Sequence, residues 1–166
     1  MSTQPTGSTG PAPTGDPAAA PLQVLELRIA LTEDDRPEDR FSHHVNNARY
    51  FAFINRTFQA WYRPMGLRDP DAPFTAVMAH VSWDFLRQVM VPGTVLCRIQ
   101  VVKAGRTSLE HQVEILDLGS EPPAVAGRGR VVHVGVEQAS GRSTPWPAEI
   151  LARCWSGEPQ SPASAS

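Results

Sequence analysis

The chain contains little cysteine, with only Cys97 and Cys154 among its 166 residues. The two lie far apart and neither belongs to a CxxC pair, so the sequence indicates neither a disulfide scaffold nor a cysteine-based zinc site. His80, His111 and His133 lie in separate predicted strands, and no cluster has the spacing of metal ligands. We therefore predict no metal and a reducing, cytoplasmic location.

The chain also lacks a large excess of charge of one sign and long apolar runs. The formal net charge is −2 and no basic cluster stands out, which argues against a nucleic-acid partner. No apolar run approaches the roughly 18 residues that a membrane helix needs, and we expect no signal peptide. The chain lacks a GxSxG elbow and a P-loop, and Gly127–Arg130 falls inside a strand pattern rather than before a helix.

Hydrophobic residues make up 41% of the chain, which is typical of a globular domain of this length. Residues 1–21 consist mostly of Pro, Thr, Ser, Gly and Ala, and residues 156–166 are similar. Such segments bury too little apolar surface to offset their ordering entropy, so we expect two disordered tails. The predicted domain spans residues 22–155.

A strand and a long helix open this domain. Apolar residues alternate with polar ones over 25–31, which predicts a strand. After a charged loop, Asn46 is a good helix N-cap, and Pro64 and Gly66 end the helix. The apolar residues at helical spacing are Phe51, Ile54, Phe58, Trp61 and Met65. With further apolar residues around them, they predict a helix that is enclosed on most sides.

The rest of the domain reads as strands. We predict strands over 77–85, 95–101, 109–115 and 124–136, joined by short turns into an antiparallel meander, with Trp83 and Phe85 in the core. A short helix is predicted over 148–153. The fold class is therefore α+β, with an antiparallel sheet of about five to six strands curled around one long central helix.

The segment His44–Phe51, which reads HVNNARYF, resembles the HVNNxxYL segment of the hydroxybenzoyl-CoA thioesterase family of hot-dog proteins. Weaker similarities follow in the same order over residues 81–94, 105–109, 126–136 and 143–149. The resemblance implies the hot-dog fold and hydrolysis of an acyl thioester. It implies a homodimer or a dimer of dimers, coenzyme A thioester as substrate rather than cofactor, and acyl-CoA or acyl carrier protein as partner.

Thioester hydrolysis requires stabilisation of the carbonyl oxygen as it becomes negative. Unpaired N–H groups at a helix N-terminus can supply this, because the helix dipole also favours negative charge there. By resemblance, the backbone N–H of Asn47 polarises the carbonyl. Asn46 and Asn47 also have a purely structural interpretation, as helix cap and loop residue.

The chain departs from the family where a general base is expected. The acid four residues before the family's His is here Arg40, and the carboxylate one turn past its Tyr is replaced around Asn55. Arginine stays protonated and cannot accept a proton from water. Three hypotheses remain open: Asp39 enters the site through a register shift, His43 is the base, or the protein binds thioesters without efficient hydrolysis.

The remaining candidates are binding residues. Two of them, His44 and Asn46, flank the helix start, and Asn55 is a polar residue on an otherwise apolar helix. By resemblance, Arg106 and Ser108 at a predicted hairpin contact the phosphates or pantetheine of coenzyme A. A dehydratase or hydratase on the same fold is the least favoured alternative, because no His-and-acid pair has the required arrangement.

Overall fold

The structure is a computed structural model that describes residues 24–38, 42–67 and 69–155. The two predicted tails lie outside these residues. The elements, in chain order, are β1 (Val24–Leu31), a 3-10 helix (Glu33–Asp35), α1 (Asn47–Tyr62), a 3-10 helix (Arg63–Met65), β2 (Phe74–Phe85), β3 (Gly93–Ala104), β4 (Ser108–Asp117), β5 (Ala124–Glu137) and α2 (Ala148–Trp155).

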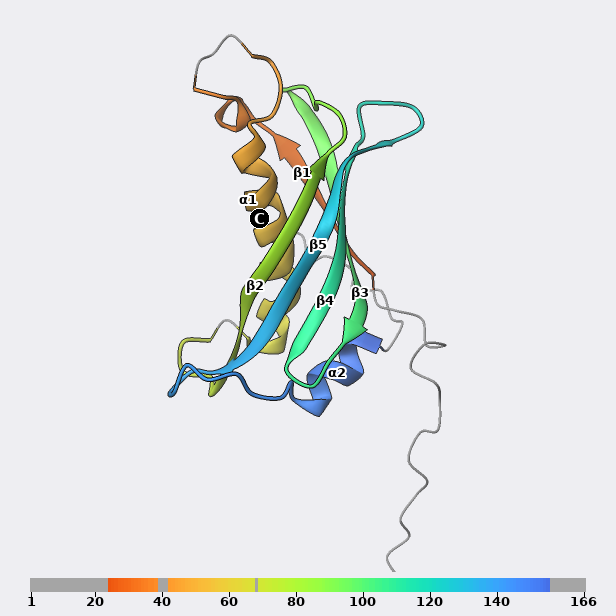
Figure 1. The fold of residues 1–166 in the computed structure, drawn as a ribbon. Helices are drawn as coiled ribbons and strands as arrows, with labels where there is room; N and C mark the ends of the chain where they lie inside the picture. Colours follow the sequence, from red (N-terminus) through yellow and green to blue (C-terminus); the bar gives the residue numbers. More distant parts are fainter. Residues whose placement is uncertain (1–23, 39–41, 68, 156–166) are drawn as a thin grey trace, which may run out of the picture.

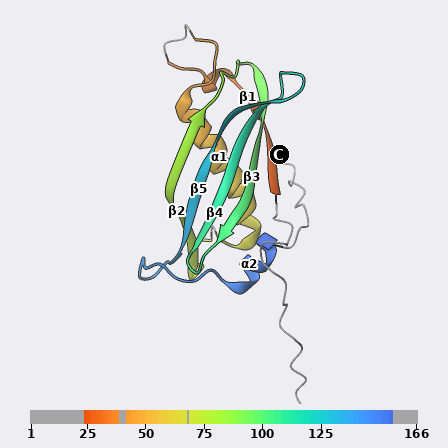
Figure 2. The same cartoon turned by 45° about the vertical axis from the view of Figure 1, so that its right-hand side comes forward.

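The five strands form one antiparallel sheet in the order β1-β3-β4-β5-β2. Helix α1 lies along one face of this curved sheet, and α2 lies near the end of the sheet where α1 finishes (Figures 1 and 2). The predicted hot-dog fold is therefore confirmed, with five strands.

The prediction of a four-strand meander was wrong for β2. Only β3, β4 and β5 are consecutive neighbours, whereas β2 pairs with β5 at one edge and β3 pairs with β1 at the other. The connection between β2 and β3 is long enough to carry the chain away from the β2 edge of the sheet to β3, which does not pair with β2. It runs beside the start of α1, where Val45 N–H donates to Val89 O at 2.8 Å and His44 forms a bridge with Met90.

Local signals determine both ends of α1. Asn46 is the N-cap, with extended backbone angles, and its side-chain oxygen accepts from Ala48 N–H at 2.9 Å. At the other end, the helix tightens into the 3-10 turn that contains Pro64, and Gly66 follows at φ 73°. A left-handed residue closes a helix, and glycine adopts this conformation without a Cβ clash.

One side of α1 packs against the sheet and forms the core. Its second half carries Phe58, Trp61 and Tyr62, all at most 1% exposed. The ring of Phe58 lies 4.9 Å from that of His111 and 4.3 Å from that of His133, in edge-to-face arrangements. We call these five residues the ring cluster. Edge-to-face rings stabilise a core beyond the burial of their apolar area.

The other side of α1 is not enclosed in this single chain, contrary to the prediction. Phe51 is 41% exposed, and the next residues on the same side are exposed as well. They are Ala52, Asn55, Arg56, Gln59 and Ala60. The sheet curls around only one side of the helix, so the remaining side faces outward.

Residues 77–82 of strand β2 are also exposed, on both faces of the strand. Its pairing with β5 shifts at Ala79, so Met78 lies opposite the buried His133 and Val81 lies opposite the buried Val131. Directly opposed residues share a face, so Met78, not Val77, shares the helix side with Val81. Because of this β-bulge, the regular alternation predicted over residues 77–85 does not hold before residue 80. Phe85, expected in the core, is 46% exposed.

None of the helices within the described residues combines the length and apolar character required to span a bilayer.

Candidate active site at the start of helix α1

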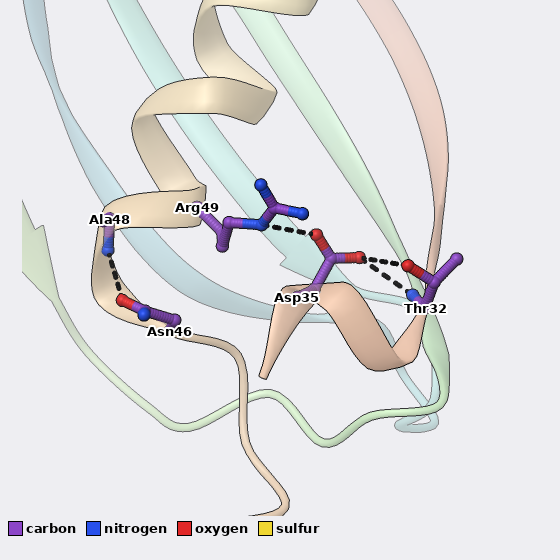
Figure 3. Close-up of polar contacts among 5 residues, drawn as sticks. All are labelled: Thr32, Asp35, Asn46, Ala48 and Arg49. Carbon is purple, nitrogen blue, oxygen red and sulfur yellow. Dashed lines mark hydrogen bonds and ion pairs between the residues drawn. The ribbon is translucent and has the colours of Figure 1, made fainter. Parts of the chain in front are cut away.

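The first turn of α1 is held by short polar contacts (Figure 3). Asn46 caps the helix through Ala48, as predicted from its position. Its own backbone N–H donates to the backbone oxygen of Asp35 at 2.8 Å. The chain before the helix is thereby tied to the segment that follows β1.

One amide of this first turn has no acceptor. Asn47 is the first helical residue and is exposed, and no residue in the described part of the chain accepts a hydrogen bond from its backbone N–H. The amide of Ala48 is taken by the cap, and Arg49 N–H donates to Asn46 O at 2.9 Å. The Asn47 amide is thus available to an external acceptor, as expected of a helix N-terminus.

A buried carboxylate lies close to this turn and was missed by the sequence interpretation. Asp35 is 6% exposed, and its Oδ1 accepts from Arg49 Nε at 3.0 Å. Its Oδ2 accepts from the Thr32 N–H at 2.8 Å and from the Thr32 hydroxyl at 3.4 Å. Figure 3 shows this chain of contacts from the end of β1 to the first turn of α1.

The contacts of Asp35 indicate a positioning role. Both of its oxygens are occupied by donors from Thr32 and Arg49. The pair with Arg49 fixes the helix start relative to β1. A Thr followed three residues later by an acid is the pattern of a helix start, and Thr32 with Asp35 was the available signal in the charged loop.

The two histidines before the helix lie in the segment that runs beside the 86–92 connection. His43 is exposed and its backbone oxygen accepts from Val91 N–H at 2.8 Å. His44 is half-buried at its bridge with Met90. Both therefore lie within a few residues of the open amide. Asp39, the first-ranked candidate base, and its neighbour Arg40 lie outside the described residues.

Asn55 lies two turns after Asn47 on the exposed side of α1. With a rise of 1.5 Å per residue, eight residues separate the two by about 12 Å along the helix axis. Asn55 is therefore positioned to line the same outer side of the helix as Phe51, rather than to touch the group at the open amide.

Arg106 and Ser108 are not brought to the helix start. They lie at the turn between β3 and β4, where the backbone oxygen of Arg106 accepts from Trp146 N–H at 3.2 Å. The opposite end of β3, at Gly93, pairs with Leu31 near the helix start. The 12 residues of β3 extend over roughly 36 Å. Residues at the two ends of β3 in one chain therefore cannot contact the same reacting group.

An aromatic wall stands beside the helix start. Tyr50 is buried, and its ring lies 5.3 Å from that of Phe85 and 6.1 Å from that of Trp83. Burial raises the pKa of the Tyr50 hydroxyl, and the negative charge of Asp117 raises it further, so the hydroxyl stays protonated at neutral pH.

Two glycines of β5 give this wall its room. A Cβ on Gly127 would lie 2.6 Å from Cζ2 of Trp83, and one on Gly129 would lie 2.8 Å from Cε3 of the same ring. Real Cβ atoms do not approach other atoms so closely. The indole therefore occupies the space that a side chain at Gly127 would fill, whereas at Gly129 the backbone oxygen of Ser82 lies closer than the indole.

Metal and thiol chemistry find no support in the described part of the chain. It contains no group of three or more His, Cys, Asp or Glu residues arranged to hold a metal ion. Cys97 is fully buried and unpaired. Burial raises the pKa of its thiol to about 12, although a side-chain hydrogen bond with Thr57 lowers it, so the reactive thiolate does not form at neutral pH.

Comparison with known proteins places this chain in a family. Residues 34–154 match the model of the thioesterase-like superfamily, and the chain belongs to that family. A protein of Bacillus subtilis strain 168, the uncharacterised YsmA, is 24% identical over 138 residues, which cover 80% of this chain and 92% of YsmA.

Two solved structures are similar in both sequence and fold. The PA2801 protein of Pseudomonas aeruginosa is 27% identical with a TM-score of 0.71, and the alignment covers 79% of this chain and 98% of that one. A thioesterase from Thermus thermophilus, solved with coenzyme A and zinc, is 25% identical with a TM-score of 0.64, covering 82% and 96%. The family and these structures support acyl-CoA thioester hydrolysis as the general activity.

Proposed function

We propose that this protein hydrolyses an acyl thioester, carried on coenzyme A or on an acyl carrier protein, at the start of α1. The observation that carries the proposal is the open N–H of Asn47 at the first turn of a helix whose other first-turn contacts are satisfied within the protein.

The open amide suits the carbonyl oxygen of a thioester. As water attacks, negative charge grows on that oxygen, and a donor already in place stabilises the charge without reorganising. The positive end of the α1 dipole acts in the same direction. Asn46 and the Asp35–Arg49 pair hold the donor in position, and His44 and Asn55 would contact other parts of the substrate.

Water must also lose a proton during the attack. Asp39 remains our first candidate for the base and His43 the second, because both lie shortly before the helix and either can accept a proton. Asp35 is a poorer candidate, since Arg49 and Thr32 occupy its oxygens.

Release of free thiol from a panel of acyl-CoA substrates tests the activity directly. The panel should contain aliphatic, aromatic and short polar acyl groups, since the acyl preference is not defined. We expect turnover above buffer for at least one class. Rates equal to buffer for every class would remove hydrolysis from consideration.

The base is tested by comparing Asp39→Ala with its neighbour Arg40→Ala. Loss of a general base typically lowers kcat by about 100-fold or more, whereas loss of a solvated loop charge changes it little. We expect the Asp39 variant alone to show the large loss. Equal, small effects would shift the role to His43, which His43→Gln would then confirm.

A second candidate function is binding without efficient hydrolysis. It is favoured by the bonding of Asp35, the one carboxylate buried among the described residues, to two donor residues. This alternative predicts measurable affinity for a non-hydrolysable acyl-CoA analogue together with thiol release no faster than in buffer.

The proposed active unit is a homodimer, or a dimer of dimers, assembled through β2. Strand β2 lies at the edge of the sheet and leaves one row of backbone groups unpaired. It also carries exposed apolar residues, Val77, Met78, Val81 and Phe85, each between 37% and 46% exposed. Arg106 and Ser108, remote from the helix start of their own chain, could reach substrate only across such an assembly.

A further inference from the structure

A segment between β5 and α2 folds back over the turn that joins β3 to β4. We call residues 142–147 the strap. The strap stays beside the end of β5, since Thr144 N–H donates to Gly135 O at 2.9 Å and Ser143 forms a bridge with Val136. Figure 1 shows this blue segment passing the end of the sheet on its way to α2. The strap is therefore placed to hold the turn between β3 and β4.

Trp146 makes the hydrogen bonds between the strap and this turn. Its backbone N–H donates to Arg106 O at 3.2 Å, and its indole Nε1–H donates to Thr107 O at 3.2 Å. Thr107 O accepts a second bond from Gly135 N–H at 2.9 Å. Trp146 is 4% exposed, and its ring lies 5.2 Å from that of Phe74. Buried tryptophans commonly combine ring packing with a bond from the indole N–H, and here the combination fixes the turn through its carbonyl oxygens.

The same turn keeps its donors open. The backbone N–H groups of Arg106 and Thr107 have no acceptor within the described residues. Arg106 is exposed, and no carboxylate in that part of the chain forms an ion pair with it. Successive open amides are typical of anion-binding turns, and a guanidinium matches the oxygens of a phosphate. The turn thus offers donors to a ligand, while the carbonyl oxygens of the same two residues are occupied inside the protein.

We propose that Trp146 is a positioning residue for substrate binding: by holding the carbonyl oxygens of the turn, it presents Arg106 and the two open amides to a phosphate group of acyl-CoA. The inference rests on the hydrolysis proposed above. The family resemblance implies the contact from Arg106, whereas the role of Trp146 comes from the bonds of the strap. Trp146 contacts no reacting atom, so it acts on substrate binding and not on bond cleavage.

Trp146→Phe tests this role through steady-state kinetics. The variant keeps an aromatic ring in the packed position and removes the N–H that donates to Thr107 O. We expect KM for acyl-CoA to rise roughly three- to tenfold, the loss typical of one hydrogen bond, with kcat unchanged. With the same acyl group carried on pantetheine, which has no phosphate, KM should not change. Equal rises for the two thioesters, or a fall in kcat at constant KM, would overturn the proposal.

Trp61→Phe is the matched control for lost packing. Trp61 is 1% exposed, and its Nε1 has no acceptor in the described part of the chain. Its ring packs against those of Phe58, Tyr62 and His111 rather than against the turn. We expect this variant to lower the stability to a similar extent while KM for acyl-CoA stays near wild type. A KM that rises as much as in Trp146→Phe would assign the effect to packing and reject the hydrogen bond as its cause.

Arg106→Gln tests whether Trp146 acts through the turn. Loss of the guanidinium should raise KM for acyl-CoA by about tenfold and leave KM for acyl-pantetheine unchanged. In the double variant with Trp146→Phe, the two effects should combine to less than their product, because a displaced turn has already lost part of the Arg106 contact. Arg142→Gln, at an exposed arginine of the strap, controls for general attraction of anions and should change little. Fully multiplicative effects would overturn the positioning role.

Binding of free coenzyme A tests the inference without turnover. By calorimetry, Kd for coenzyme A should rise roughly three- to tenfold in Trp146→Phe, whereas Kd for pantetheine should not differ from that of the unsubstituted protein. In the unsubstituted protein, coenzyme A should shift the amide signals of Arg106 and Thr107 in nuclear magnetic resonance spectra, and pantetheine should not. This second measurement needs no variant, so it decides the matter even where Trp146→Phe fails to fold. Unshifted signals at saturating coenzyme A would overturn the proposal.

These outcomes separate the positioning role from the proposed activity. Thiol release with a KM that Trp146→Phe leaves unchanged would reject the role and leave hydrolysis standing. An affinity for coenzyme A that depends on Trp146, in a protein without thiol release, would support the role and reject hydrolysis. A protein that neither releases thiol nor binds coenzyme A would reject both.

Discussion

Helix α1 begins at the open amide of Asn47 and ends in the buried ring cluster. At its first turn, Asn47 is exposed and its N–H has no acceptor in the described part of the chain. In its last two turns, Phe58, Trp61 and Tyr62 are covered by the sheet and contact two buried histidines. The same helix therefore has an open end, where we propose that the reaction takes place, and a buried structural end.

The difference shows how a helix can be anchored by burial at one end and keep a polar group open at the other. Burial in the ring cluster anchors the helix, so the first turn need not satisfy all of its own polar groups to stay in place. The contacts of Asp35 with Arg49 and Thr32 supply the remaining positioning at the open end. Substitutions at the two ends should accordingly affect different measurements.

The largest effect on stability is expected from Phe58→Ala. Removing a fully buried ring leaves a cavity and typically lowers the free energy of unfolding by about 3–5 kcal/mol. Urea denaturation monitored by circular dichroism measures this loss. Phe51→Ala on the exposed side of the same helix is the matched control and should change stability by less than about 1 kcal/mol. Equal losses would mean that the two sides of α1 are equally buried in the assembled protein.

The largest effect on activity is expected from Asn47→Pro. Proline is tolerated at the first helical position, where it removes the amide hydrogen together with the asparagine side chain, and the extended angles of Asn46 suit a residue before proline. We expect kcat/KM for thiol release to fall about 100- to 1,000-fold with little change in stability. Asn47→Ala keeps the amide and should stay near wild type. Similar losses in both variants would assign the role to the side chain.

Acid should destabilise the sealed end through His111. Burial lowers the pKa of its imidazole to about 4, although backbone hydrogen bonds with Val131 and Leu109 raise it. Between pH 6.5 and 4 the unfolded chain binds a proton that the folded chain does not, so stability falls as pH falls, by about 1.4 kcal/mol per unit. This contribution is fully present above pH 6.5.

Denaturant unfolding at several pH values measures this slope. His111→Leu should flatten the slope between pH 6.5 and 4, whatever its stability at neutral pH. His43→Leu, at an exposed histidine, should leave the slope unchanged. An unaltered slope in His111→Leu would assign the acid sensitivity to other groups.

The smallest effect is expected at the cap. Asn46→Ala removes the acceptor for Ala48 N–H and should lower the free energy of unfolding by about 1 kcal/mol. Asn46→Ser retains an acceptor and should recover most of this loss. Thermal unfolding of the two variants measures the difference, and identical midpoints would show that the cap contact is not maintained in solution.

The parts of the fold that could be predicted depend on local chemistry. Asn46, Pro64 and Gly66 determined the ends of α1 through capping and backbone preference, and alternation located the strands. The structure also leaves the amide of Asn47 open, as the position of the helix start suggested. Its role in catalysis, and those of Asp39 and His43, remain predictions.

The parts that could not be predicted depend on contacts distant in the sequence. Strand order is such a case, because the turn before β3 looks like a hairpin although β2 crosses to the far edge. The bulge at Ala79 exchanges faces without any mark in the alternation. The exposed side of α1 could not be predicted either, because the apolar residues Phe51 and Ala52 on that side extend the same pattern as the buried residues of the helix.

The pairing of Gly127 and Gly129 with the indole of Trp83 imposes a reciprocal constraint on how this protein can vary. A methyl group gained at Gly127 would collide with that ring, so it would have to be accompanied by a smaller residue at position 83. The width of the wall beside the helix start thus depends jointly on two strands, and variants that alter this width should be sought as compensating pairs rather than as single changes.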